Sequence, residues 1–147
     1  ISPDEGSVSF PRVSYDGNYL VYSMGEYGYF HAWHKESDLH ILNLETGDSR
    51  VLDEINSPEA ESCHSWSLSG RWIVFGSRRL DGLYTRPFIA HIDESGHCSK
   101  PFILPQKATD YYQNSMFSFN LPEFVSGRVE IKRKRISHSL ENPLQVN

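Results

Sequence analysis

The sequence has little cysteine and no long apolar run. Its two cysteines, Cys63 and Cys98, leave the redox compartment open and form no Cys-x-x-Cys motif. No stretch approaches the roughly 18 consecutive apolar residues of a transmembrane helix. The sequence therefore predicts no membrane span in this segment.

Motifs of catalysis and cofactor binding are also missing. The sequence contains no Gly-x-Ser-x-Gly nucleophile motif, no phosphate-binding Gly-rich loop and no Cys-x-x-Cys-His haem motif. His31, His34 and His40 lie close together in the sequence, but a His-x-x-His pair with no further ligand motif is a weak sign of zinc. We therefore expect neither an enzyme nor a bound metal or cofactor.

Aromatic residues, by contrast, are plentiful. They make up 13% of the chain, which favours β structure because rings pack well on a pleated surface. The net charge is only −5, which gives no general case for binding nucleic acid. The basic run at 132–135 is flanked by Ile131 and Ile136, and we interpret it as a solvated segment.

The strongest pattern is an internal repeat. Residues 13–23 align without a gap with residues 66–76, at an offset of 53 positions throughout. Ser14 aligns with Ser67, and Gly17 aligns with Gly70. In the first copy, the turn Ser-Tyr-Asp-Gly offers a side-chain acceptor and a glycine that can adopt positive φ. The segments that follow these turns, 19–22 and 72–75, are apolar strands.

A second matching block follows in each copy. LHILNLETG at 39–47 aligns with FIAHIDESG at 88–96, and a short apolar strand comes after each. Each copy thus predicts four antiparallel strands, the composition of one β-propeller blade. Two hairpins of a β-sandwich are the alternative. Trp66 and Trp72 are expected to help hold the second blade together.

These residues resemble a known family. The run Pro-x-x-Ser-x-Asp-Gly at 11–17, the strand YLVYS at 19–23 and DLHILNLETG at 38–47 are similar to the WD40-like (PD40) repeat of TolB-like β-propellers. The resemblance covers roughly residues 7 to 105, and the end of the chain resembles Bacteroidetes-type periplasmic members. It implies an extracytoplasmic propeller, although Ser69 replaces the usual Asp.

The fold class predicted is all-β: two four-stranded antiparallel blades of an incomplete propeller, followed by an irregular tail. The blades occupy about 7–54 and 60–105 within 1–106, and the tail is 107–147. Because a ring needs four to eight blades, we expect a C-terminal piece of a longer chain. Open blade faces should drive self-association unless the tail covers them. The apolar residues of the tail that suit this role are Tyr111, Tyr112, Met116, Phe117, Phe119, Leu121 and Phe124.

Two long connections hold the candidate binding residues, because loops on a rigid scaffold often carry function. In the first, 24–37, these are Tyr27, Tyr29 and Trp33. In the second, 77–87, they are Arg78, Arg79, Tyr84 and Arg86. Rings packed over the neighbouring blade and arginines paired with acids such as Asp81 are the structural alternatives.

Three functions fit this pattern. The first is a non-catalytic binding or scaffold module of the cell envelope with a protein partner. The second is the substrate-gating propeller of a larger prolyl oligopeptidase-like hydrolase. The third is a glycan-binding surface built from aromatic side chains of both connections, namely Tyr27, Tyr29, Trp33 and Tyr84.

Overall fold

The chain folds into two four-stranded antiparallel sheets, in a computed structural model that describes residues 6–128, 130, 131, 135 and 138. The first sheet has the order β1-β2-β3-β4, and the second has the order β5-β6-β7-β8. Their bounds are Ser7–Val13, Tyr19–Gly25, Asp38–Asn43 and Ser49–Val51, then Glu61–Trp66, Trp72–Ser77, Arg86–His91 and Phe102–Ile103. The prediction of four antiparallel strands in each repeat is confirmed. Two short helices, η1 (His31–Trp33) and α1 (Tyr111–Asn114), complete the described elements.

The repeat extends to the irregularities of the strands. In the first sheet the pairing of β1 with β2 shifts between Ser9 and Arg12, and in the second the pairing of β5 with β6 shifts between Ser62 and Ser65. Both shifts contain a residue with φ of 53°, which is Phe10 in one copy and Cys63 in the other. Each bulge therefore lies at the same place, 53 positions apart, and bends its strand in the same way.

The predicted turns form as expected, with one hydrogen-bond pattern in both copies. In the first, the Ser14 hydroxyl donates to the Asp16 carboxylate at 2.6 Å, and the backbone N–H of Tyr19 donates to Ser14 Oγ at 3.0 Å. Gly17 closes this turn with φ of 77°. In the second, the Ser67 and Ser69 hydroxyls lie 3.0 Å apart. A hydroxyl thus replaces the carboxylate without changing the turn.

The alignment of the third strands needs a correction of one residue. Tyr22 pairs with His40, and its counterpart Phe75 pairs with Phe88, so the strands match at an offset of 48 positions. The sequence alignment placed Leu39 opposite Phe88 instead. The cause is the turn after the third strand, which has one more residue in the second copy. The turn glycines, Gly47 and Gly96, therefore align at an offset of 49 positions.

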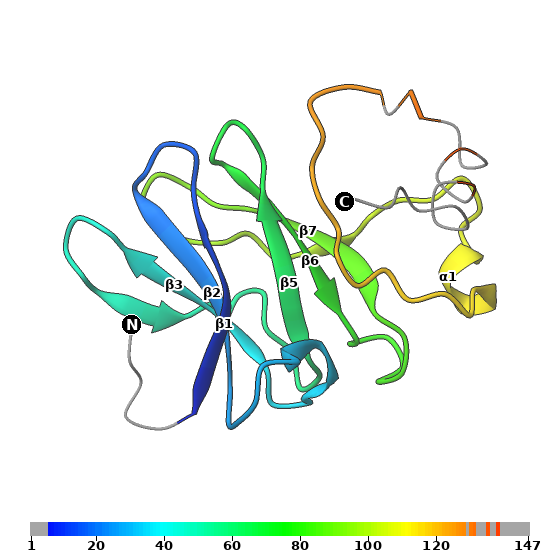
Figure 1. The fold of residues 1–147 in the computed structure, drawn as a ribbon, viewed down its shortest axis with the longest axis horizontal. Helices are drawn as coiled ribbons and strands as arrows, with labels where there is room; N and C mark the ends of the chain where they lie inside the picture. Colours follow the sequence, from blue (N-terminus) through cyan, green and yellow to red (C-terminus); the bar gives the residue numbers. More distant parts are fainter. Residues whose placement is uncertain (1–5, 129, 132–134, 136–137, 139–147) are drawn as a thin grey trace, which may run out of the picture.

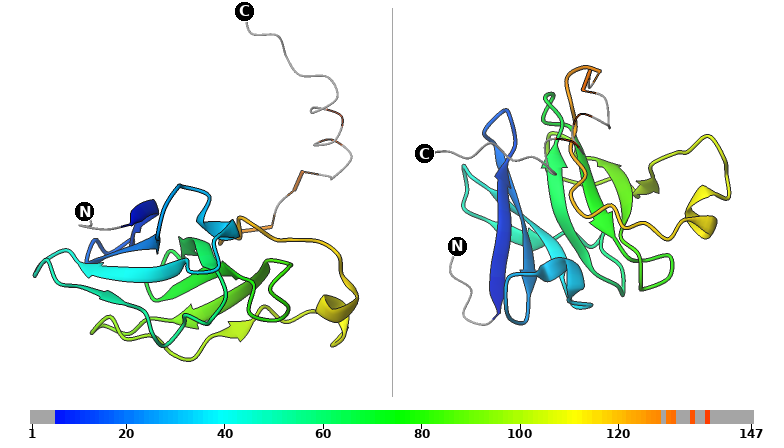
Figure 2. Two further views of the ribbon diagram at one scale, coloured as in Figure 1. Left: turned by 90° about the horizontal axis from the view of Figure 1, so that it is seen from below. Right: turned by 45° about the vertical axis from the view of Figure 1, so that its right-hand side comes forward.

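The sheets pack face to face around one core. We call the buried side chains of the first sheet the Val21 face (Tyr19, Val21, Leu39, Ile41) and those of the second the Phe75 face (Ile73, Phe75, Phe88, Ala90). These two faces are not equivalent positions of the repeat, because Val21 corresponds to Val74 and not to Phe75. The sheets therefore stack head to tail, which means that each sheet turns a different face of the repeat toward the other. They lie side by side in Figures 1 and 2.

Polar contacts across this interface join the two repeats. Buried His64 donates from Nε2 to the Val21 carbonyl at 2.9 Å, and the Trp66 indole donates to the Arg12 carbonyl at 3.0 Å. Near the same turns the Tyr19 hydroxyl donates to the Glu94 carbonyl at 3.0 Å. Trp66 thus joins the second repeat to the first, a contact that the sequence did not predict.

Trp72 does not have the buried position expected of it. The residue is 39% exposed, and its ring meets the His91 and Phe102 rings of the same sheet edge to face. Its counterpart Tyr19 is 7% exposed, because the second sheet covers it. No third sheet covers Trp72 among the described residues. Both cysteines are free, and Cys63 is buried.

Candidate functional site

The connections β2–β3 and β6–β7 come from the same end of the two stacked sheets, at the bottom of the view in Figure 1. Four rings of the first connection stand out into solvent, each between 65% and 78% exposed. Together with Arg78 from the second connection we call them the aromatic loop surface: Tyr27, Tyr29, Phe30, Trp33 and Arg78. This exposure differs from the packed-ring alternative considered for this loop.

A cation–π contact joins the two repeats at this surface. The Arg78 guanidinium carbon lies 4.1 Å from the centroid of the Trp33 ring. Nearby, Lys35 forms an ion pair of 2.8 Å with Glu59, which also links the two repeats. The Trp33 ring of the first connection thus lies beside Arg78 of the second connection, and an ion pair links the two repeats near it.

His31 fixes the base of the first connection. Its ring is fully buried, with Nδ1 2.8 Å from Ser9 Oγ and Nε2 2.8 Å from Ser7 Oγ and 3.2 Å from the Gly28 carbonyl. Since a carbonyl only accepts, Nε2 carries the proton. Burial lowers the pKa of His31, which favours the neutral form of the ring. This histidine anchors the loop to β1.

His34 supports the rings from below. Its ring lies 4.5 Å from that of Tyr27, and its Nδ1 lies 3.1 Å from Glu36 Oε1. Both histidines of the His-x-x-His pair therefore have structural partners. Within the described residues, no three His, Cys, Asp or Glu side chains gather in a way that could hold a metal ion.

Two of the predicted binding arginines turn inward. Arg79 donates to the buried Glu61 carboxylate at 3.0 Å, and its guanidinium lies 4.5 Å from the Phe88 ring centroid. Arg86 is buried and donates to the backbone carbonyls of tail residues. Both guanidiniums are directed to internal acceptors, and of their nitrogens only Nε of Arg86 is buried without a hydrogen-bond partner among the described residues. These contacts agree with the alternative in which the arginines pair with acids, because Arg86 also lies 3.8 Å from Asp81.

Tyr84 is half-buried with the Arg86 guanidinium 5.0 Å from its ring centroid. It belongs with the internal group around Arg86 and not with the exposed rings. Of the seven predicted residues, the structure thus brings Trp33 and Arg78 into contact and keeps Tyr27 and Tyr29 exposed in the same loop. Phe30, which was not among them, is 72% exposed.

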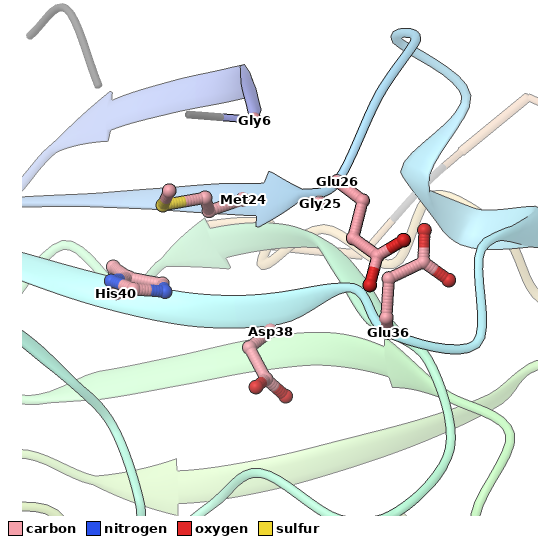
Figure 3. A pocket seen from close by; sticks show the side chains of 7 residues that line it. All are labelled: Gly6, Met24, Gly25, Glu26, Glu36, Asp38 and His40. Carbon is pink, nitrogen blue, oxygen red and sulfur yellow. The ribbon is translucent and has the colours of Figure 1, made fainter. Parts of the chain in front are cut away.

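A pocket of about 530 Å³ opens beside this connection, on the side of the first sheet that faces away from the second. Figure 3 shows the Glu26 and Glu36 carboxylates near the end of β2, with Asp38 and His40 along β3. Burial, with the charge of Asp53 in second place, raises the pKa of Asp38. Sequence reasoning missed this acidic pocket. The signal in the sequence was three acidic residues, Glu26, Glu36 and Asp38, at the two ends of the β2–β3 connection.

The arrangement offers contact area and not an evident reaction centre. Exposed rings provide a large surface at a small entropy cost, and the acidic pocket beside them suits a basic side chain. In the part of the chain that is described, no helix has the length and apolar character needed to cross a membrane. Comparison with known proteins finds no matching family model and no matching curated protein.

Proposed function

We propose that this chain is a non-catalytic binding module made of two β-propeller blades of the TolB-like, WD40-like type, acting outside the cytoplasm. The head-to-tail stacking of two sheets with identical strand order supports the propeller assignment, since each sheet uses a different face toward its neighbour. The family and the periplasmic location rest on the resemblance of residues 7–105.

The aromatic loop surface is the observation that carries the binding function. Exposed rings that gain burial on association dominate the binding energy of many protein interfaces, and tryptophan, tyrosine and arginine are the most enriched residues there. Trp33 and Arg78 are already stacked at 4.1 Å, which reduces the entropy lost on binding. The partner that best fits this surface is a protein.

The histidines near this surface support a non-catalytic role. His31 is held by Ser7 and Ser9, and His34 interacts with Glu36. A general base must face its substrate with a free nitrogen. His31 instead uses both ring nitrogens to shape the loop, and His34 uses Nδ1 in the same way.

Photo-cross-linking tests the proposal. A benzophenone amino acid at Tyr29, incubated with the cell-envelope fraction of the source organism, should give one defined protein adduct. The matched control places the same group at Tyr15, which is 66% exposed but lies in the turn at the opposite end of β2. Trp33→Ala in the Tyr29-labelled protein should abolish the adduct, because the partner loses its central ring contact.

The result that contradicts the proposal is equal labelling from both positions, or an adduct that survives Trp33→Ala. Loss of the adduct upon addition of soluble oligosaccharide would instead favour the glycan-binding alternative.

A further inference from the structure

The second sheet has an outer face that repeats the buried face of the first. We call it the Val74 face: Val74, Pro87, Ile89 and Leu104. Val74 pairs with Ile89 as Val21 pairs with Ile41. The backbone N–H of Leu104 donates to the Pro87 carbonyl at 2.9 Å, as that of Leu52 does to Leu39 at 3.0 Å. This face is therefore built to receive another sheet.

The chain's own tail occupies this face. Residues 119–124 lie against it, and the Phe119 N–H donates to the Thr85 carbonyl at 2.9 Å. In Figure 1 this orange segment lies on the side of the second sheet away from the first. The fit is loose, because a cavity of about 370 Å³ remains between tail and sheet. The equivalent face of the first sheet is filled by the core instead.

Arg86 fastens the tail. Its guanidinium donates to the Tyr112 carbonyl at 3.0 Å and to the Ser115 carbonyl at 2.7 Å, and also to that of Phe117. Three carbonyls of one segment thus depend on one buried side chain. Several apolar tail residues nevertheless point to solvent, including Met116, Phe117 and Leu121, each more than 70% exposed. The tail is held mainly by this polar contact and by Tyr112 and Phe119.

The opposite face of the molecule carries the complementary set. We call it the Tyr22 face: Leu20, Tyr22, His40 and Leu42, which correspond in the repeat to Ile73, Phe75, Phe88 and Ala90. Within the chain, those four counterparts make up the Phe75 face, which packs against the Val21 face. One molecule therefore has both halves of its internal interface, one on each outer side. On the Tyr22 face, Leu20, His40 and Leu42 are half-buried, and Tyr22 is 4% exposed with its ring stacked on His40.

We propose that the tail is a displaceable cover and that the Val74 face beneath it binds the Tyr22 face of a second copy of this chain. The contact repeats the internal stacking of the two sheets, with Val74 in the place of Val21 and Tyr22 in the place of Phe75. Because the two faces differ, the association is head to tail and can continue beyond a dimer. This inference rests on the stacking of the repeats and does not depend on the aromatic loop surface.

The test releases the cover in the full chain. Arg86→Met keeps an apolar stem of similar length but removes all three carbonyl contacts. Sedimentation velocity should show a monomer for the parent and a doubling or more of the mass for Arg86→Met, with Arg86→Lys in between. Hydrogen exchange in 107–124 should accelerate in the same variant. If Arg86→Met fails to fold, Phe119→Ser serves as the second variant, because it loosens the same tail and keeps the buried Arg86 side chain.

Two blocked variants identify the faces. In the Arg86→Met background, Ile89→Glu charges the Val74 face and Leu42→Glu charges the Tyr22 face. Each variant should be monomeric alone. Their mixture should form a dimer and nothing larger, because the Ile89→Glu variant keeps only its Tyr22 face and the Leu42→Glu variant keeps only its Val74 face. A folded, released variant that stays monomeric overturns the proposal. So does association that survives either block, or a mixture that does not pair. The cross-linking at Tyr29 is unaffected by these outcomes.

Discussion

Tyr19 and Trp72 begin the second strand of their sheets at equivalent positions, yet Tyr19 is 7% exposed and Trp72 is 39% exposed. Tyr19 donates its hydroxyl to the Glu94 carbonyl of the second repeat, and its ring lies against Gly96. Trp72 has only the rings of its own sheet beside it. The difference in exposure arises because the second repeat covers Tyr19, and not from the position of either residue in its own strand.

The two sheets thus share their local structure but not their surroundings. Their turns, bulges and strand order coincide because these depend on residues close in sequence. Their burial differs because the first sheet is covered by a sheet and the second by a tail. Substitutions at equivalent positions should therefore change the free energy of unfolding by different amounts where the side chain contacts a neighbouring sheet or the tail. They should change it by similar amounts where the side chain contacts only its own turn.

The largest difference is expected at positions 26 and 79, which correspond in the repeat. Arg79 pairs with Glu61, a carboxylate with no exposed surface, whereas Glu26 lines an open pocket. Arg79→Ala leaves the buried carboxylate without its cation and should lower the free energy of unfolding by about 3–5 kcal/mol. Glu26→Ala should lower it by less than about 0.5 kcal/mol. Urea denaturation measures both.

An equal loss in both variants would show that Glu61 does not need Arg79. That result is conceivable only if Ser57 and Ser77, which donate to the same carboxylate at 2.7 Å and 2.6 Å, satisfy it alone. Glu61→Gln in the Arg79→Ala background distinguishes the two cases, because it removes the charge and should restore most of the loss.

The second comparison concerns Tyr19 and Trp72 themselves. Tyr19→Ala opens a cavity between the sheets and should cost about 3 kcal/mol. Trp72→Ala removes a ring that water already reaches and should cost about 1 kcal/mol. Thermal unfolding followed by far-UV circular dichroism gives the ranking. A greater loss from Trp72→Ala would mean that another part of the protein covers this ring in solution.

Much of the fold could be predicted because its signals are local. The turn at Ser14 and Gly17 needs only a side-chain acceptor and a residue that tolerates positive φ, and both are visible in the sequence. The apolar runs that follow these turns, at 19–22 and 72–75, predicted the second strands for the same reason. The offset of the third strands could not be predicted, because one extra turn residue moves the glycine without moving the strand.

The candidate site was harder to predict because its residues are sorted by long-range contacts. Arg78 and Arg79 are adjacent in sequence, yet one stacks on Trp33 and the other pairs with Glu61. The inward direction of Arg79 depends on the position of β5, which the sequence of the loop does not reveal. Exposed rings such as Tyr27 and Tyr29 were easier to predict, since a long connection has few places to bury them.

A third difference should appear on acidification, at position 64. Burial lowers the pKa of His64 to about 4, and the equivalent residue of the first repeat is Pro11, which does not titrate. The unfolded chain takes up this proton near the ordinary pKa of 6.5, so the contribution is complete above that pH and declines as the pH falls toward 4. Between pH 7 and pH 5 the loss should be about 2 kcal/mol.

His64→Gln isolates this contribution, because its amide can still donate to the Val21 carbonyl but does not titrate. Urea denaturation of parent and variant at both pH values gives the difference, with His97→Gln on an exposed turn as the control. If parent and His64→Gln lose stability in parallel, the His64 ring is not neutral and buried in the native state.

The smallest effect is expected where the two repeats agree, in the turns of Asp16 and Ser69. The Asp16 carboxylate accepts from the Ser14 hydroxyl at 2.6 Å and from the Asn18 N–H at 3.2 Å, while Ser69 Oγ accepts from the Arg71 N–H at 3.4 Å. Ser69→Asp should shorten these contacts and raise the free energy of unfolding by about 0.5 kcal/mol, whereas Asp16→Ser should lower it by about 1 kcal/mol.

The pH dependence of these two variants checks that the carboxylate is the cause. The Ser14 hydrogen bond holds the pKa of Asp16 below its ordinary value of 3.8, so its stabilisation is present above that pH and is lost as the pH falls further. The gain from Ser69→Asp should disappear over the same range, and the double exchange should recover about half of the loss from Asp16→Ser at neutral pH. A gain that persists in acid would come from the shape of the side chain, and the carboxylate would then not be what distinguishes the two turns.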